Sequence, residues 1–172
     1  VMTANIEAGK YYDYVELYNN SDTPFPIGHY TFYYQASSVT REWNCAYDQV
    51  IEPHQSLVVW IGKNKNLTIA DFNKAYGTDL VENQDIVKVY YSAGLHISSE
   101  RTYVIGYSGS GPLYQLQINE NGADLTDLEG TSIHYTYPRR AGIEGIKVTT
   151  ALSCSPGTVE DWQVPRAGQA VA

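Results

Sequence analysis

Short segments with strand-like alternation, each ended by turn residues, follow one another along almost the whole chain. The first, in YYDYVELYNN, places Val15 and Leu17 on one face of a predicted strand and Tyr14, Glu16 and Tyr18 on the other. This pattern is typical of a half-buried strand, which packs one face on a core and leaves the other toward water. Polar residues and two prolines then form a predicted turn.

The same signals predict further strands. SLVVWIG, residues 56–62, is an apolar run of strand length that follows a turn and ends in Gly. The others are expected in HYTFYYQ, DIVKVYYSAG, RTYVIGYSG, LYQLQINENG, SIHYTY and GIKVTT, and Asn121-Gly122 is a strong hairpin signal. The spacing is close to the roughly 8–12 residues of sandwich strand–turn units. The predicted fold class is therefore all-β, with the strands arranged as a sandwich.

One segment, residues 67–77, has the signals of a short helix in a connection. Thr68 is placed to cap it, Asp71 stands in its first turn and Gly77 is placed to end it. The length of 172 residues fits a single domain. We expect that domain to span residues 1–172, with an irregular tail after about residue 163.

The charge balance limits the partners. The net charge is −8 and the pI is about 4.8, which is the wrong sign for holding a nucleic-acid backbone through Lys and Arg. No apolar run approaches the roughly 20 residues of a transmembrane helix. The sequence begins abruptly, without a signal peptide, as a mature or excised fragment would, so this start leaves secretion open.

Two cysteines, Cys45 and Cys154, match no zinc pattern, because a structural zinc site needs four ligands at close spacing. A disulfide between them would close a long loop and stabilise the protein by roughly 4–5 kcal/mol in the chain-entropy model. The alternative is two small, buried apolar side chains. Both alternatives stay open on the sequence alone.

No catalytic spacing is found. The four histidines, which are His29, His54, His96 and His134, are scattered. GYSGSGP lies between two predicted strands, whereas a nucleophile elbow needs a strand that turns into a helix. The acidic segment 119–130 offers oxygen ligands for calcium without an EF-hand pattern, so a hairpin tip is the preferred interpretation.

Aromatic side chains are the remaining functional signal, with sixteen Tyr, three Trp and three Phe. Trp60 lies in an apolar strand and is expected in the core. Trp43, in a polar segment, and Trp162, in the tail, are candidate recognition aromatics for a sugar ring or a protein partner. The competing interpretation is that each of these two rings plugs an end of the sandwich.

The first strand and turn carry a family resemblance. VELYN at 15–19, the Ser21-Asp22 turn, and Gly28 with Tyr30 opening the next strand resemble the start of the lamin-tail domain, where Trp is usual at the position of Tyr30. IEPHQSLVVWIG, INENGADL, GTSIHYTYPRR and SPGTVEDW are similar to later segments of that family. The resemblance extends over nearly the whole chain, with insertions around ASSVTREWNCAYDQ and at the predicted helix.

This resemblance implies an immunoglobulin-like β-sandwich of about seven to nine strands, with no catalytic residues and no cofactor. We expect a non-catalytic interaction or adhesion module of a secreted or cell-surface protein, which binds a protein or a cell-surface partner. The alternative is a carbohydrate-binding module that uses exposed Tyr and Trp rings. A third class, an enzyme, would require His and carboxylate groups to converge in a cleft.

Glu16 is a carboxylate between two apolar residues and points away from their face. We predict that it is held by an ion pair or a hydrogen bond, with Arg101 or Arg140 as the candidate basic partners.

Overall fold

The protein is a mostly β structure with one short α-helix. The computed structural model describes residues 11–36, 39–92, 101–106, 112–118, 132–135, 148–151, 154–161 and 164. Side chains are described for most of residues 11–92 and for 154–161. The predicted hairpin at Asn121-Gly122 and the acidic segment 119–130 lie outside the described residues.

A three-stranded sheet forms the centre of the described structure. It consists of β1 (Tyr12–Tyr18), β4 (Ser56–Gly62) and β5 (Ile86–Tyr90), in the order β1-β4-β5. β1 is antiparallel to β4, whereas β5 is parallel to β4. The chain passes from β4 to β5 through helix α1 (Ile69–Tyr76), which supplies the long crossover that a parallel pair needs.

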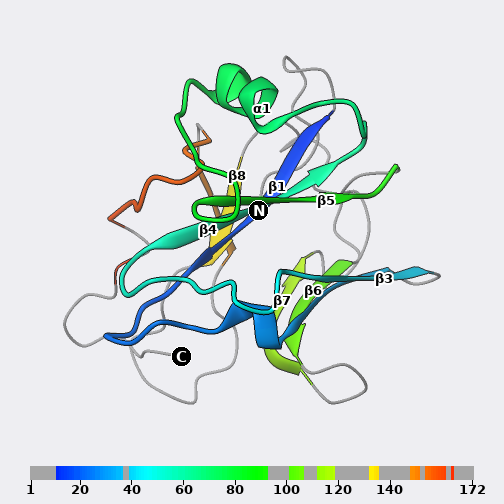
Figure 1. Ribbon diagram of the computed structural model, residues 1–172. Coiled ribbons are helices and arrows are strands. Elements are labelled where there is room, and N and C mark those ends of the chain that lie inside the picture. Colours follow the sequence, from blue (N-terminus) through cyan, green and yellow to red (C-terminus); the bar gives the residue numbers. More distant parts are fainter. Residues whose placement is uncertain are drawn as a thin grey trace.

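A four-stranded antiparallel sheet lies below the central sheet in the view of Figure 1. Its strands are β2 (Thr31–Ala36), β3 (Val39–Asn44), β6 (Arg101–Gly106) and β7 (Pro112–Ile118), in the order β3-β2-β6-β7. β8 (Ser132–Tyr135) and β9 (Val148–Ala151) form a separate antiparallel pair. A 3₁₀ turn, η1 (Ile27–His29), leads into β2.

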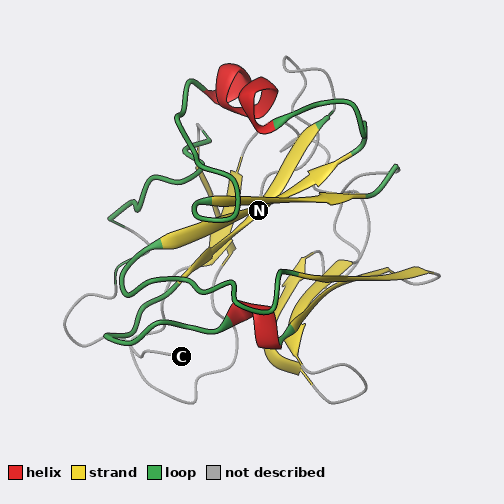
Figure 2. Cartoon of the chain, viewed as in Figure 1, coloured by secondary structure: helices red, strands yellow, loops and turns green. Residues whose placement is uncertain are grey.

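Two apolar clusters lie on opposite faces of the central sheet. The first joins that sheet to the four-stranded sheet, through residues such as Val59 of β4 and Phe32 of β2. The second lies under α1, where Phe72 packs with Trp60 and Tyr14. The described structure therefore has three layers, with a helix, a central sheet and a second sheet (Figure 2).

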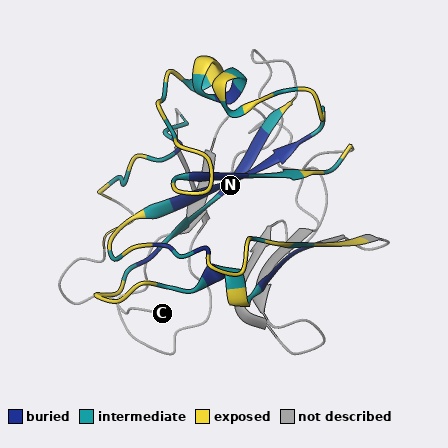
Figure 3. Ribbon diagram, in the orientation of Figure 1, coloured by how far each residue is buried: buried dark blue, intermediate teal, exposed yellow. Residues whose placement is uncertain are grey.

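The two faces of β1 and β4 are both covered, which corrects the prediction that β1 is half-buried. Val15 packs in the first cluster, and Tyr14, on the opposite face, packs in the second and is only 3% exposed. In Figure 3 the central strands are coloured mainly as buried, and exposed residues of α1 lie on its outer side. Sequence alternation did not reveal this, because Tyr14 and Tyr18 resemble the outward residues of an ordinary amphipathic strand.

The helix begins and ends as its sequence predicts. The Thr68 N–H and hydroxyl both donate to the Asp71 carboxylate, at 2.8 and 2.9 Å, and Gly77 ends the helix in the left-handed conformation. The Thr68 backbone bond holds the pKa of Asp71 below its ordinary value. A carboxyl with a lowered folded pKa stabilises the fold at neutral pH, and this contribution is lost as the pH falls through that lowered value.

Lys88 of β5 ties the loop before α1 to the sheet. Its Nζ donates to the carbonyl oxygens of Asn64, Lys65 and Leu67, and it lies 4.6 Å from the centre of the Trp60 ring. Its partial burial lowers the pKa of this ammonium.

Within the described part of the chain, no helix has both the length and the apolar character needed to cross a membrane.

Segment 39–44 forms a strand that the sequence did not predict. This strand, β3, pairs with β2 from Ala36↔Val39 to Thr31↔Asn44. Trp43 therefore lies on a strand and not in a polar loop. The polar residues Thr40, Arg41 and Glu42 obscured the strand in the sequence, because an edge strand carries charged side chains that a central strand does not.

Truncation of Phe72 tests the packing of the helix layer. Phe72 is fully buried, and its ring centre lies 4.8 Å from that of Tyr76 and 5.3 Å from that of Trp60. We expect Phe72→Ala to lower the free energy of unfolding by about 3–5 kcal/mol, measured by urea denaturation. Lys74→Ala, at an exposed position of the same helix, is the control and should change it by less than about 0.5 kcal/mol. Equal losses in the two variants would contradict the burial of Phe72.

Candidate functional site

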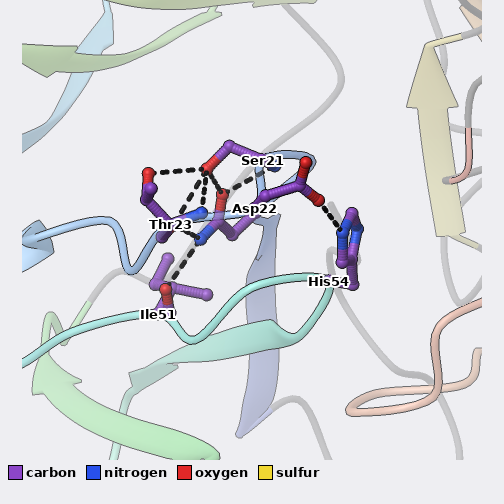
Figure 4. Close-up of polar contacts among 6 residues, drawn as sticks. Ser21, Asp22, Thr23, Ile51 and His54 are labelled. Carbon is purple, nitrogen blue, oxygen red and sulfur yellow. Dashed lines mark hydrogen bonds and ion pairs between the residues drawn. The ribbon is translucent and has the colours of Figure 1, made fainter.

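The turn after β1 and the turn before β4 meet in one polar corner, because these two strands are antiparallel neighbours. We use the name polar corner for Asn19, Ser21, Asp22, Thr23 and His54, with the Ile51 carbonyl, shown in Figure 4. The backbone joins the two turns, since the Asn19 N–H donates to Gln55 O and the His54 N–H donates to Asn19 O, each at 2.9 Å. The corner therefore lies where β1 ends and β4 begins.

Asn19 holds the polar corner together. Its Nδ2 donates to the carbonyl oxygens of Thr23, at 2.7 Å, and Ile51, at 2.9 Å. Its Oδ1 accepts from the Ser21 N–H at 3.0 Å and lies 2.8 Å from the Ser21 hydroxyl oxygen. The residue is 7% exposed, so these bonds satisfy an amide that would be costly to bury alone.

The corner contains Ser, Asp and His, the residue types of a hydrolytic triad, in a different arrangement. His54 Nε2 lies 2.8 Å from Asp22 Oδ1. The Ser21 hydroxyl lies against Asn19 Oδ1 and the Thr23 carbonyl and not against the imidazole (Figure 4). A triad needs the hydroxyl hydrogen-bonded to the base, and the base oriented by the acid through its other nitrogen. This arrangement stabilises the two turns and does not activate Ser21.

The pair between His54 and Asp22 is exposed, with side-chain exposures of 53% and 96%. Exposed pairs of this kind contribute little to stability. His54 also adopts a positive φ of 56°, a conformation that His tolerates better than most residues.

At Gly28, close packing against the backbone leaves no room for a side chain. A Cβ at this position would lie 2.1 Å from Ala46 O and 2.5 Å from Tyr47 O. The Gly28 N–H donates to Gln49 O at 3.0 Å. Asn19 and Gly28 therefore have structural roles, and they fix the segments on which the neighbouring loops stand.

The prediction that Glu16 is held by a hydrogen bond is confirmed, while the Arg140 residue and the Arg101 side chain lie outside what the structure describes. The backbone N–H of Gly157 donates to Glu16 Oε2 at 3.2 Å, across 141 residues of sequence. Gly157 has a φ of 79° and belongs to the SPG turn. The bond fastens this turn to β1, and a backbone donor of this kind cannot be identified from residue types.

The predicted recognition aromatics have different environments. The Trp43 ring stacks on Phe32 at 5.6 Å and is partly buried against the first cluster, and Trp162 lies outside the described residues. Trp60 is fully buried, as predicted for a core residue. Tyr47, which the sequence did not single out, is 77% exposed, and its ring lies 4.5 Å from that of His29. The only available signal was its position in a polar, turn-like segment.

Cys45 and Cys154 do not form a disulfide with each other in this structure. Cys45 packs against the first cluster, and Cys154 packs against the second. Burial raises the pKa of each thiol, which favours its protonated form. Within the described ranges, no three His, Cys, Asp or Glu side chains are grouped so that they could hold a metal ion.

The comparisons with known proteins give one distant relative. No family model matches the chain. The chain is similar to "Uncharacterized protein YvnB" of Bacillus subtilis (strain 168), with 26% identity over 172 residues. The match covers 96% of this chain and 13% of that protein, so the chain corresponds to a small part of that relative's length.

Replacement of the Asn19 amide by a carboxyl group tests the polar corner. Asn19→Asp replaces a two-donor amide by acceptors that face the Thr23 and Ile51 carbonyls. We expect a loss of at least about 2 kcal/mol in the free energy of unfolding at pH 7, by urea denaturation. The loss should shrink as the pH falls toward about 4, because the protonated carboxyl regains a donor. Asp22→Asn is the exposed control, and a similar loss there would refute the role of Asn19.

Two glycines in the left-handed conformation provide a matched pair for the SPG turn. A Cβ at Gly157 would lie 2.3 Å from Leu80 Cδ2, whereas nothing lies within 4 Å of a Cβ at Gly77. We expect Gly77→Ala to cost about 1–2 kcal/mol from its backbone conformation alone. Gly157→Ala should cost about 1 kcal/mol more, because Leu80 must also move. Thermal and urea unfolding measure both, and equal costs would mean that Leu80 is not packed on the turn.

Proposed function

We propose that this chain is a non-catalytic interaction or adhesion module, which binds a protein or a cell-surface partner. The observation that carries the proposal is Tyr47, a large aromatic side chain that is 77% exposed and whose carbonyl packs closely against Gly28. Exposed Tyr residues are enriched at the centres of protein interfaces, because an apolar ring and a hydroxyl both contribute to contact. The Gly28 packing and the bond from Gly28 N–H to Gln49 O fix the loop that presents Tyr47.

We propose further that the fold is an immunoglobulin-like sandwich of the lamin-tail type. Two sheets that share the first apolar cluster support this assignment. The structural roles of Asn19 and Gly28 also support it, since both belong to the motif that resembles the family. The parallel pair β4 and β5, joined through α1, is an addition to an antiparallel sandwich.

The proposal includes a location outside the cell or on its surface, as expected from the family resemblance. It also includes the absence of catalysis, which the direction of the Ser21 hydroxyl supports. The net charge of −8 favours a partner surface that is neutral or basic.

Binding by the native domain tests the proposal. We expect the labelled protein to bind saturably to cell-envelope or secreted protein from its source organism, with a Kd that rises at least about 10-fold in Tyr47→Ala. Tyr47→Phe keeps the ring and is the matched control, and circular dichroism establishes that all three proteins are folded. Equal affinities of the native protein and Tyr47→Ala would exclude this surface. Turnover of a phosphoester or glycoside substrate that is abolished by His54→Ala would refute the non-catalytic assignment.

A further inference from the structure

A cavity of about 630 Å³ lies beside the polar corner. Its walls come from Ala46 and segment 48–52, from Gln55 and Ser56 at the start of β4, and from the turn 83–85 before β5. These segments meet because β5 is parallel to β4, and the Val58 N–H donates to Asp85 O at 2.9 Å. The volume is within the range of small-molecule sites, roughly 300–1,000 Å³.

One polar side chain of the wall is buried and keeps unused hydrogen-bonding capacity toward the cavity. Gln49 is 6% exposed, and its Nε2 donates to the adjacent Val50 O at 3.2 Å. Within the described structure, no hydrogen bond reaches its Oε1, which is open to a ligand or to water. The Ser56 hydroxyl oxygen also has no partner among the described residues, but it is sealed from solvent and does not face the cavity.

The chemistry of the wall selects the ligand. Its charged side chains among the described residues are the carboxylates Asp48, Glu52 and Asp85, with no Lys, Arg or His in that set, so an anionic ligand would be repelled. The amides of the wall both donate and accept. An ammonium or guanidinium offers donors alone and would leave the amide N–H groups unmatched. Hydroxyl groups satisfy all of these side chains.

We propose that this cavity binds an uncharged saccharide of one or two sugar units. Gln49 Oε1 accepts from a sugar hydroxyl at the buried end, and Asp48 and Glu52 accept from hydroxyls nearer to solvent. Asp85 already accepts from the Val81 N–H at 2.9 Å, so it holds the wall in place. This site goes beyond the proposed partner surface at Tyr47 and uses different side chains.

Titration of the isotope-labelled protein, followed by backbone amide NMR spectra, tests the proposal. The probes are cellobiose, maltose and N,N′-diacetylchitobiose, with digalacturonic acid as an anionic comparison and tetralysine as a cationic one. We expect at least one neutral disaccharide, at up to ~10 mM, to shift amides of segment 46–52 and turn 83–85 saturably. No saturable shift from any neutral disaccharide would overturn the proposal, as would a response to tetralysine or digalacturonic acid alone.

Two variants separate a binding role from a structural one. Gln49→Met keeps the length of the side chain and removes the amide, and we expect about a 3- to 10-fold weaker affinity for the disaccharide. Ser56→Ala removes a sealed hydroxyl without a partner, so it should leave the thermal stability unchanged or raised and leave the affinity unchanged. Asp22→Asn, outside the cavity wall, should bind as the native protein does.

Unchanged affinity in Gln49→Met would refute the proposed contact. Weaker binding in Ser56→Ala would also contradict the proposal, because the Ser56 hydroxyl does not face the cavity. Loss of partner binding in Tyr47→Ala with retained disaccharide binding would show that the two sites are separate. Failure of the Tyr47 proposal is thus distinguishable from failure of the saccharide proposal.

Discussion

Burial of β4 on both faces is the constraint on which the described structure depends. Leu57, Val59 and Ile61 face the second sheet, while Val58 and Trp60 face helix α1. A strand with apolar side chains on both faces must be covered twice, because exposure of either row would leave several large side chains in water. The helix connection and the four-stranded sheet provide these two covers. The partners of β4 inside its own sheet, β1 and β5, then bring their adjoining turns to its ends.

The candidate sites follow from this placement. Because β1 runs antiparallel to β4, the turn after β1 reaches the turn before β4, and Asn19 can bond the carbonyls of both. Because β5 runs parallel to β4, the turn 83–85 lies beside Ser56 and closes one wall of the cavity. The polar corner and the cavity thus depend on the two pairings of one buried strand. The side chains in the corner satisfy one another, whereas Gln49 Oε1 in the cavity does not find a partner in the described structure.

Local signals predicted the elements whose boundaries depend on nearby residues. The apolar run 56–62 forms β4, and Thr68, Asp71 and Gly77 mark the ends of α1 because capping is settled within one turn of a helix. Segment 39–44 was missed, because its strand state comes from pairing with β2 and not from its own alternation. The hydrogen-bonded state of Glu16 was predicted from its chemistry, but the backbone N–H that donates to it from 141 residues away depends on the path of the chain.

The sequence by itself determined a mostly β chain with one helix, an acidic surface charge and a polar turn after the first strand, since these features follow from residue types at close spacing. Only the tertiary structure decided which aromatics are exposed. Trp43 stacks on Phe32 while Tyr47, four residues later, stands in solvent. It also decided that Ser21 faces Asn19 and not His54. The physical reason is that burial and the direction of a hydrogen bond depend on segments brought together by strand pairing, and no local pattern contains that information.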